Sequence, residues 1–592
     1  MFISLLDWFI IGFVLLLSLV IGIISMKRAG KNPEEFFAGG KNMPWWLLGI
    51  SMVATTFSTD TPNLVTDIVR EHGVAGNWVW FAFLLTGMFT VYVYARLWKR
   101  SGVLTDIEFY ELRYSGKSAA FLRGFRAIYL GVIFNILVMA AVTLAAIKIG
   151  NILLGLEPVE TVIVTGIIIV IYSSLGGLRG VLITDFFQFF LAMSGSIYLM
   201  FYSVKKAGGM DKIVNSDIIS GKLSLLPNFS DTETLVAMFV IPIAVQWWAV
   251  WYSGFEPGGG GYIAQRMFAA KDEKNALNAT LLFNITNFAL RPWPWIITAL
   301  ASLIIFPDLA SLSSAFPHID PEILRNDIAY PAMITFLPPG IMGLVLASLI
   351  AAYMSTISTH LNWGSSYIVN DFYKRFIKKD AGDRKLVAIG RISTTILMFV
   401  ACIIALFLEN ALQAFNILLQ IGAGTGLLFM LRWFWWRINA ISELSAMISA
   451  LVMAIYFEFI HTAIGFSEPA NWVKLISAVI ITTIVWITAT MITKPSDSKA
   501  LLKFYKKVQP GGSGWNGFIM MMNRKGIEIE RAEFKKGDFA QKLLKIFLGT
   551  FSVYSFLFSI GFWIEQKQLP TIIAISVFLI STIMLWRSQR EI

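Results

Sequence analysis

The sequence contains little of what a soluble protein needs. Only 14% of its 592 residues are charged, 56% are hydrophobic, and the mean hydropathy is +0.68. Soluble domains carry about 25% charged residues, so a deficit of this size excludes a soluble enzyme or a DNA-binding protein. Cys402 is the only cysteine, which excludes an intrachain disulfide scaffold. The composition therefore predicts an integral membrane protein.

Motifs for nucleotide, metal and nucleophile chemistry are also missing. Gly116-Lys117-Ser118 resembles the end of a phosphate-binding loop, but Glu111 stands where the leading glycine belongs. The four histidines fall in separate segments without a second ligand at metal-site spacing. No glycine-flanked serine elbow occurs beside a candidate base. We therefore expect a protein that is not an enzyme.

Long apolar runs are what the sequence has instead. A helix needs about 20 mostly apolar residues to cross a bilayer, and these runs lack the alternation of outer-membrane barrel strands. We expect an all-α polytopic membrane protein with about 15 transmembrane spans. Their approximate limits are 5–26, 44–69, 76–96, 124–153, 158–176, 180–203, 234–255, 279–304, 335–371, 386–408, 411–433, 440–464, 473–493, 543–564 and 570–587.

The positions of the basic residues predict the orientation. With the N-terminus outside, 38 of the 48 Lys and Arg fall on the cytoplasmic side, nine fall outside, and Arg291 lies within a span. Because cytoplasmic loops are enriched in Lys and Arg, this distribution favours an external N-terminus and a cytoplasmic C-terminus. It also explains the net charge of +11 without a nucleic-acid partner.

One sizeable polar stretch, residues 494–542, is basic and contains several glycines. Lys503, Lys506 and Lys507 stand beside Phe504 and Tyr505, a combination that suits the anionic inner leaflet of a membrane. A solvated connector before two accessory helices is the alternative interpretation.

The second span contains groups that are costly in lipid. Residues 54–63 read Ala-Thr-Thr-Phe-Ser-Thr-Asp-Thr-Pro-Asn, with five hydroxyls and a carboxyl. Such groups are expected to face a cavity. Pro62 has no N–H to donate, which frees carbonyl oxygens near residues 54–58 to bind something else. We therefore predict a broken helix with a binding function, against the alternative of a plain proline kink.

The ninth span carries a polar stripe. Ala352, Ser355, Thr356 and Thr359 share one helical face, with Ser358 at its edge. Oxygen ligands of this kind suit a hard alkali cation rather than a transition metal. Close helix packing is the other use of such residues, so the cation interpretation depends on the broken second span.

The seventh span is the second interrupted segment. Residues 246–257 are rich in Trp and Tyr, end in Glu-Pro, and are followed by four glycines. The aromatic residues also fit an interfacial belt. However, two interrupted helices at matching positions of two halves indicate an inverted-repeat transporter with its site at the midplane.

Several motifs together resemble the sodium:solute symporter family, which includes bacterial proline, sugar and sialic acid carriers and the animal sodium/glucose cotransporters. The resemblance runs from about Leu5 to Trp436. It rests on Phe36-Phe37-Ala38-Gly39-Gly40, Pro44-Trp45-Trp46, Gly176-Gly177 with Thr184-Asp185, Tyr262-Ile263-Ala264-Gln265-Arg266, and Asn370-Asp371-Phe372-Tyr373-Lys374. It implies a LeuT-like core of two inverted five-helix repeats, spans 2–6 and 7–11, in a multi-pass protein of the bacterial inner (plasma) membrane.

The resemblance also implies sites for Na⁺. The main sodium site would use backbone carbonyls and hydroxyls of the broken helix and the ninth span, at Ala54, Phe57, Ala352, Ser355 and Thr356. A second sodium site closer to the cytoplasm would use Asp185, Ser358 and Thr359. In the alternative role, Asp185 caps a helix near Arg179.

Solute-facing positions follow from the same comparison. They are Thr56, Ser58, Asp60, Trp251, Tyr252 and Gln420, and Arg291 joins them as a charged residue within a span. An aromatic platform with hydroxyl and amide donors suits a sugar. Arg291 could hold a solute carboxylate or pair with Asp60. The insertion of Glu256, Pro257 and four glycines departs from the family pattern beside the break.

These observations predict a sodium-coupled symporter that imports a small polar solute, most simply a sugar, by alternating access. The alternatives are an anionic solute such as sialic acid or a carboxylate, an amino acid, and a non-transporting membrane solute sensor. The expected partners are the solute, sodium ions and the lipid bilayer, with no obligate protein partner. The expected parts are a leading helix and loop (1–43), the transport core (44–436), accessory helices (437–493), the basic connector (494–542) and C-terminal helices (543–592).

Overall fold

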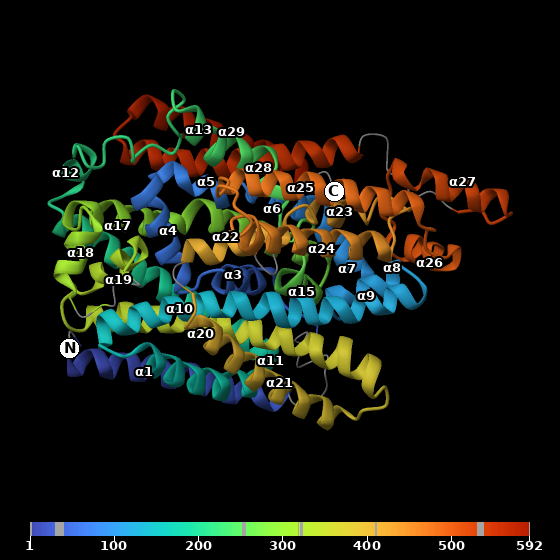
Figure 1. Cartoon of the computed structure of the whole chain (residues 1–592), viewed down its shortest axis with the longest axis horizontal. Coiled ribbons are helices and arrows are strands. Elements are labelled where there is room, and N and C mark those ends of the chain that lie inside the picture. Colours follow the sequence, from blue (N-terminus) through green and yellow to red (C-terminus); the bar gives the residue numbers. More distant parts are fainter. Residues whose placement is uncertain are drawn as a thin grey trace.

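The computed structural model describes residues 3–29, 41–250, 256–317, 319, 324–408, 411–529 and 538–590. Within these ranges the regular structure is helical, and the one β-type contact is an isolated bridge between Met43 and Ala270. Most of the long helices run along the long axis of the molecule (Figure 1). The all-helical prediction is confirmed.

The helices occupy most of the described chain. The first are α1 (Leu5–Ala29), α3 (Trp45–Thr55), α4 (Asp60–His72), α5 (Trp78–Phe81), α6 (Leu84–Phe89), α7 (Ala95–Ser101), α8 (Phe109–Arg113), α9 (Gly116–Ile128), α10 (Asn135–Leu154) and α11 (Pro158–Lys206). The next are α12 (Met210–Val214), α13 (Thr232–Leu235), α14 (Ile241–Ala244), α15 (Gly261–Ala269), α16 (Glu273–Ile285), α17 (Pro292–Ile305), α18 (Leu309–Ala315), α19 (Ala329–Ile334) and α20 (Ile341–Ser366). The last are α21 (Asp383–Ala405), α22 (Ala411–Gly422), α23 (Gly426–Leu431), α24 (Ala440–Ile455), α25 (Asn471–Ile492), α26 (Ser498–Val508), α27 (Asn516–Arg524), α28 (Asp538–Ile564) and α29 (Gln568–Arg590).

Several of these helices are joined without a loop. A π-helical turn at Tyr129–Phe134 connects α9 to α10, and another at Thr286–Leu290 leads from α16 towards α17. A third, Tyr367–Ile377, extends α20. The ninth predicted span is therefore part of one long helical stretch.

Every predicted span but one overlaps an apolar helix of the described structure, although fewer than the predicted 15 are long enough to cross a membrane. Among the described residues, 10 helical stretches are long and apolar enough to cross a membrane, and four shorter apolar helices accompany them. The exception is the predicted span 411–433, because α22 ends at Gly422 and α23 begins at Gly426. A Cβ atom on Gly422 would lie 1.8 Å from the carbonyl oxygen of Val250, and one on Gly426 would lie 1.5 Å from that of Trp248. The glycines that allow this backbone contact also flank the break between α22 and α23.

Helix α11 is longer than one span. Its 49 residues would extend about 74 Å at about 1.5 Å per residue, more than twice the hydrocarbon thickness of about 30 Å. Its apolar parts are Pro158–Ile171 and Leu178–Lys206. Only the second part is long enough to count as a membrane span, and residues 176–177, which separate two predicted spans, are helical in the structure.

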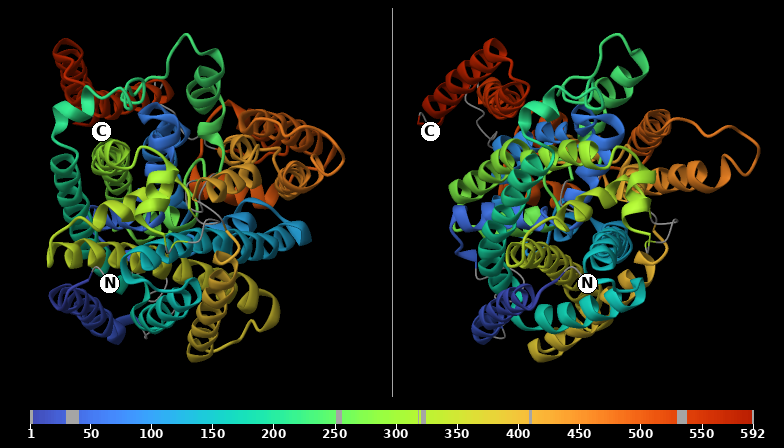
Figure 2. Two further views of the ribbon diagram at one scale, coloured as in Figure 1. Left: turned by 60° about the vertical axis from the view of Figure 1, so that its left-hand side comes forward. Right: turned by 90° about the vertical axis from the view of Figure 1, so that its left-hand side faces the viewer.

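Helix α3 lies at the centre of the bundle. It packs against α11, α15, α16 and α20. Helix α1 packs on α11 and α20, whereas the α28–α29 hairpin lies on the opposite side of the molecule (Figures 1 and 2). The segments that surround α3 therefore come from both halves of the predicted core.

The seventh predicted span is interrupted, as the sequence indicates. Helix α14 ends at Ala244, a short turn follows at Gln246–Trp248, and α15 begins at Gly261. Residues 256–270, which fall between two predicted spans, are buried, and most of them form α15. Gly258 and Gly259 adopt φ angles of 88° and 77°, which allow this segment to fold back into the protein.

Candidate functional site: a break in α3–α4 between two buried arginines

The second predicted span is broken where the sequence predicts. Helix α3 ends at Thr55, residues 56–59 are not helical, and α4 begins at Asp60. Pro62 lies in the first turn of α4, where backbone N–H groups have no intrahelical partner anyway. The carbonyl oxygen of Thr55 accepts a hydrogen bond from the Thr356 hydroxyl of α20 at 2.8 Å. A carbonyl at the end of α3 is thus bound by a side chain about 300 residues away in the sequence.

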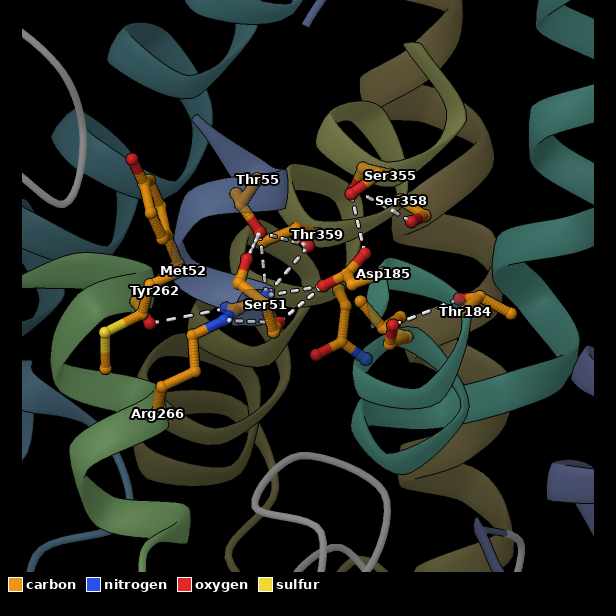
Figure 3. A network of polar contacts seen from close by, with 12 residues as sticks. Ser51, Met52, Thr55, Thr184, Asp185, Tyr262, Arg266, Ser355, Ser358 and Thr359 are labelled. Atoms are coloured by element: carbon orange, nitrogen blue, oxygen red, sulfur yellow. Dashed lines mark hydrogen bonds and ion pairs between the residues drawn. The ribbon is translucent and has the colours of Figure 1, made fainter. Parts of the chain in front are cut away.

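Asp185 lies beside this break (Figure 3). It is fully buried on α11, and its Oδ1 accepts a hydrogen bond from the Ser355 hydroxyl at 2.6 Å. Its Oδ2 accepts one from the Ser51 hydroxyl at 2.5 Å and lies 3.4 Å from a guanidinium nitrogen of Arg266. One carboxylate therefore joins α11 to α3, α20 and α15.

Arg266 is the cation of this cluster. Its Nε donates to the Ser51 hydroxyl at 3.0 Å, and its Nη2 donates to the hydroxyls of Thr55 at 2.9 Å and Thr359 at 3.1 Å. The side chain is fully buried. Arginine stays protonated in proteins, so a permanent positive charge lies among one carboxylate and three hydroxyls.

The residues predicted for the two sodium sites are neighbours in the structure. Ser355, predicted for the main site, contacts Asp185, which was predicted for the second. Thr359 contacts Arg266, and the Ser358 hydroxyl donates to the Ser355 carbonyl of its own helix at 3.1 Å. Ala54, Phe57 and Ala352 are buried, and α3 packs against α20. The predicted oxygen donors are therefore gathered around one helix crossing.

A second arginine lies on the α17 side of the break. Arg291 Nη1 donates to the Thr56 hydroxyl at 2.8 Å and to the Val53 carbonyl at 3.3 Å. Its guanidinium carbon lies 5.3 Å from the ring centroid of Trp295. Asn287 Oδ1 also lies 3.2 Å from the Thr56 hydroxyl. The last turn of α3 is thus tied to the α16–α17 stretch.

The other predicted solute residues do not all lie at the break. Ser58 and Asp60 lie at the break, and the Ser58 hydroxyl and Asp60 Oδ1 have no hydrogen-bond partner among the described residues. Gln420 is buried on α22, which packs against α4. Trp251 and Tyr252 lie outside the described residues.

Residues 256–261 are buried and contact α9 through Glu256. Arg126 Nη2 and Glu256 Oε1 lie 2.5 Å apart, and each side chain is only 2% exposed. Trp98 donates to the Gly258 carbonyl at 2.7 Å, and the Gly261 N–H donates to Asp106 at 2.9 Å. Burial and the nearby Glu256 carboxylate raise the pKa of Asp106. The segment that departs from the family pattern is therefore held by charged and aromatic partners.

Sequence reasoning missed Arg266, Ser51, Thr55 and Asn287. Arg266 belongs to a motif on which the resemblance rests, but its segment reads as a cytoplasmic loop, which gives no sign of burial. Ser51 and Thr55 are spaced i, i+4 on α3, which places them on one face. Their polar face was a usable signal. Within the described ranges, no group of three His, Cys, Asp or Glu side chains could hold a metal ion.

Comparison of the sequence with known protein families identifies one match. A model described as "Sodium:solute symporter family" matches residues 36–450, more than half of the chain. The chain belongs to the sodium:solute symporter family.

Individual relatives of this symporter are distant but extensive. The sodium/glucose cotransporter of Vibrio parahaemolyticus is 26% identical over 499 residues, which cover 80% of this chain and 89% of that protein. The sodium/sialic acid symporter of Proteus mirabilis is 24% identical over 456 residues, which cover 74% and 86%. A solved structure of a substrate-bound, outward-open Na⁺-coupled sialic acid symporter has a TM-score of 0.66 at 19% identity, and the match covers 83% of this chain and 99% of that one.

The family places the chain among multi-pass membrane proteins that couple solute transport to sodium. These proteins are transporters rather than enzymes. Sodium is accordingly a co-substrate of this symporter rather than a cofactor.

Proposed function

We propose that the driving sodium ion binds where α3 ends and crosses α20. Its ligands are the carbonyl oxygens of Ala54, Phe57 and Ala352 and the hydroxyls of Ser355 and Thr356. The observation that carries this proposal is the hydrogen bond from Thr356 to the carbonyl of Thr55. It brings the oxygen stripe of α20 against the opened end of α3, where uncharged oxygens suit a hard monovalent cation.

Asp185, Ser358 and Thr359 form the second sodium site in this proposal, with Arg266 as its competitor. The guanidinium already lies 3.4 Å from Asp185 and 3.1 Å from the Thr359 hydroxyl. A sodium ion beside Asp185 would face this fixed charge at close range, so the second ion binds only when Arg266 withdraws towards its own helix. Occupation of the second site is thereby coupled to the position of α15.

The transported solute in our proposal is a neutral sugar or a similar polyhydroxylated compound. It binds beside Thr56, Ser58 and Asp60, with Trp251, Tyr252, Arg291 and Gln420 as further contacts. Two observations support a neutral solute. Arg291 donates hydrogen bonds to Thr56 and Val53 within the protein, and Asp60 on the same side would repel an anion. Three relatives are named for the transport of neutral solutes, which are glucose, mannose and myo-inositol.

The transport cycle in this proposal is alternating access by two inverted repeats, spans 2–6 and 7–11. The interrupted second and seventh spans occupy matching positions in these repeats, as midplane sites require. Sodium between α3 and α20 connects the two repeats and raises the affinity for the solute. By linkage, the solute raises the affinity for sodium by the same factor. We retain the domain limits given above, the external N-terminus and the cytoplasmic C-terminus as parts of the proposal.

Uptake into proteoliposomes tests the function. Purified protein should accumulate a labelled sugar when sodium is higher outside than inside, and should not do so in a potassium gradient of equal size. Binding to a panel of hexoses, sialic acid, amino acids and monocarboxylates identifies the solute class. Tight sodium-dependent binding of an acid, with no binding of any sugar, would replace the neutral solute by an anionic one.

A further inference from the structure

Helix α26 presents two different faces. Leu501, Phe504, Tyr505 and Val508 are buried against the protein. The opposite side carries four exposed lysines, which we call the α26 lysine face: Lys499, Lys503, Lys506 and Lys507. The helix is therefore amphipathic, and only its charged side is available to another molecule.

The apolar side of α26 is firmly covered. The ring of Phe504 stacks on Trp515 at a centroid distance of 5.9 Å, and Trp515 donates to the Trp433 carbonyl at 2.9 Å. The Arg113 guanidinium lies over both rings, 5.3 Å from Phe504 and 5.1 Å from Trp515. Phe504 and Tyr505 are therefore buried in the protein and are not available to a bilayer. Only the exposed lysines of α26 remain available for contact with a membrane.

That charge is strongly positive. Residues 494–529 contain seven basic and two acidic side chains. The seven basic residues are all exposed, and none of them forms an ion pair within the described part of the chain: Lys494, Lys499, Lys503, Lys506, Lys507, Arg524 and Lys525. A fixed surface with this surplus requires an anionic partner or counterions.

The position of α26 selects the partner. Helix α25, a candidate membrane span, ends at Ile492, and α26 begins at Ser498. The five residues between them reach at most about 17 Å. Figure 1 shows α26 and α27 together at the end of the molecule away from the N-terminus. The first turn of α26 must therefore lie near the surface of the bilayer.

We propose that the α26 lysine face binds the anionic phosphate headgroups of lipids in the adjoining leaflet. Headgroups of this charge attract basic segments within about a Debye length of the surface. The rigid apolar side holds the lysines in place, so binding requires no folding of the helix. Lipid is favoured over a soluble acidic protein because the short connection to α25 keeps the lysines beside the membrane.

The test is lipid binding by the purified full-length protein, measured with a fluorescent phosphatidylglycerol and a matching phosphatidylcholine. We expect wild type to prefer phosphatidylglycerol by about tenfold, a difference of about 1.4 kcal/mol. The combined replacement Lys499→Gln, Lys503→Gln, Lys506→Gln and Lys507→Gln should remove most of this preference. A matched control with the same change of charge replaces four other exposed lysines: Lys374, Lys378, Lys379 and Lys385.

Salt and free phosphate complete the experiment. Raising the salt from about 0.1 M to about 1 M shortens the Debye length from about 10 Å to about 3 Å and should abolish the preference. A phosphatidylglycerol preference that survives in the α26 variant, or falls equally in the control, would overturn the proposal. So would displacement of the lipid by inorganic phosphate at constant ionic strength, which would indicate a site for the free ion. None of these readouts requires transport.

Discussion

The two arginines beside the α3–α4 break differ in their hydrogen bonds to other described helices. Arg266 of α15 contacts Ser51 and Thr55 of α3, Asp185 of α11 and Thr359 of α20, so it ties four helices together. Arg291, at the start of α17, contacts the last turn of α3 and the ring of Trp295 in its own helix. A buried charge is tolerated when its surroundings supply an opposite charge and hydrogen-bond partners. The side that supplies more of them, around Arg266, is expected to be the more sensitive to substitution.

The largest expected effect is at the Arg266–Asp185 pair. Arg266→Gln or Asp185→Asn leaves one buried charge without its partner and should destabilise the protein by about 3–5 kcal/mol. The double variant should recover most of this loss because no net charge remains. Thermal unfolding of the purified variants measures both effects.

The exposed pair of Arg100 and Glu273 supplies the control. Its atoms are 2.9 Å apart, but the side chains are 38% and 39% exposed. Solvent screening should hold the cost of Arg100→Gln below about 1 kcal/mol. If Arg266→Gln lowered the unfolding temperature no more than Arg100→Gln does, the contacts of Arg266 with the other three helices would not stabilise the protein.

A smaller loss is expected at Arg291. Arg291→Gln removes charge-assisted hydrogen bonds to Thr56 and Val53, worth about 1–3 kcal/mol together with the unpaired acceptors. With a neutral solute, the variant should show lower stability and expression but keep the order of preference among sugars. Arg291→Lys retains the charge, so its stability should lie between those of wild type and Arg291→Gln. Selective loss of binding of one acidic solute, in a variant that still folds and binds sodium, would reverse this assignment.

The sodium ligands are expected to have a more local effect. Ser355→Ala or Thr356→Ala removes one oxygen, which should raise the sodium concentration for half-maximal uptake by about tenfold. Ser348→Ala is the matched control, since Ser348 is a buried serine of the same helix that donates only to Val345 of that helix in the described structure. Unchanged sodium dependence in both ligand variants would remove the main site from this crossing.

The smallest effect concerns the number of ions. If Arg266 yields to a second sodium ion, uptake should depend on sodium with a Hill coefficient above one. Asp185→Asn should lower the coefficient towards one while some transport remains. Charge measurements that give one sodium per solute in wild type would mean that the guanidinium occupies this position throughout the cycle.

Much of the site could be predicted because its chemistry is local in sequence. The break between Thr55 and Asp60 follows from hydroxyls and Pro62 in an apolar span, and the structure confirms it. The polar face of α20 follows from helical spacing. By contrast, Asp185 and Arg266 are 81 residues apart, and no spacing rule connects them. The hydrogen bond from Ser355 of α20 to Asp185 likewise joins residues that no spacing rule connects.

By itself, the sequence determined the spans and the interruptions, because bilayer thickness and backbone hydrogen bonding constrain each segment separately. The apolar runs mark every long helix, and glycine, proline and hydroxyl residues mark where two of the predicted spans open. Only the tertiary structure decided which polar groups meet. It buried residues 256–270, brought Arg266 into the oxygen cluster, and packed Phe504 against Trp515. The match of a charge or a ring to its partner depends on how distant helices pack.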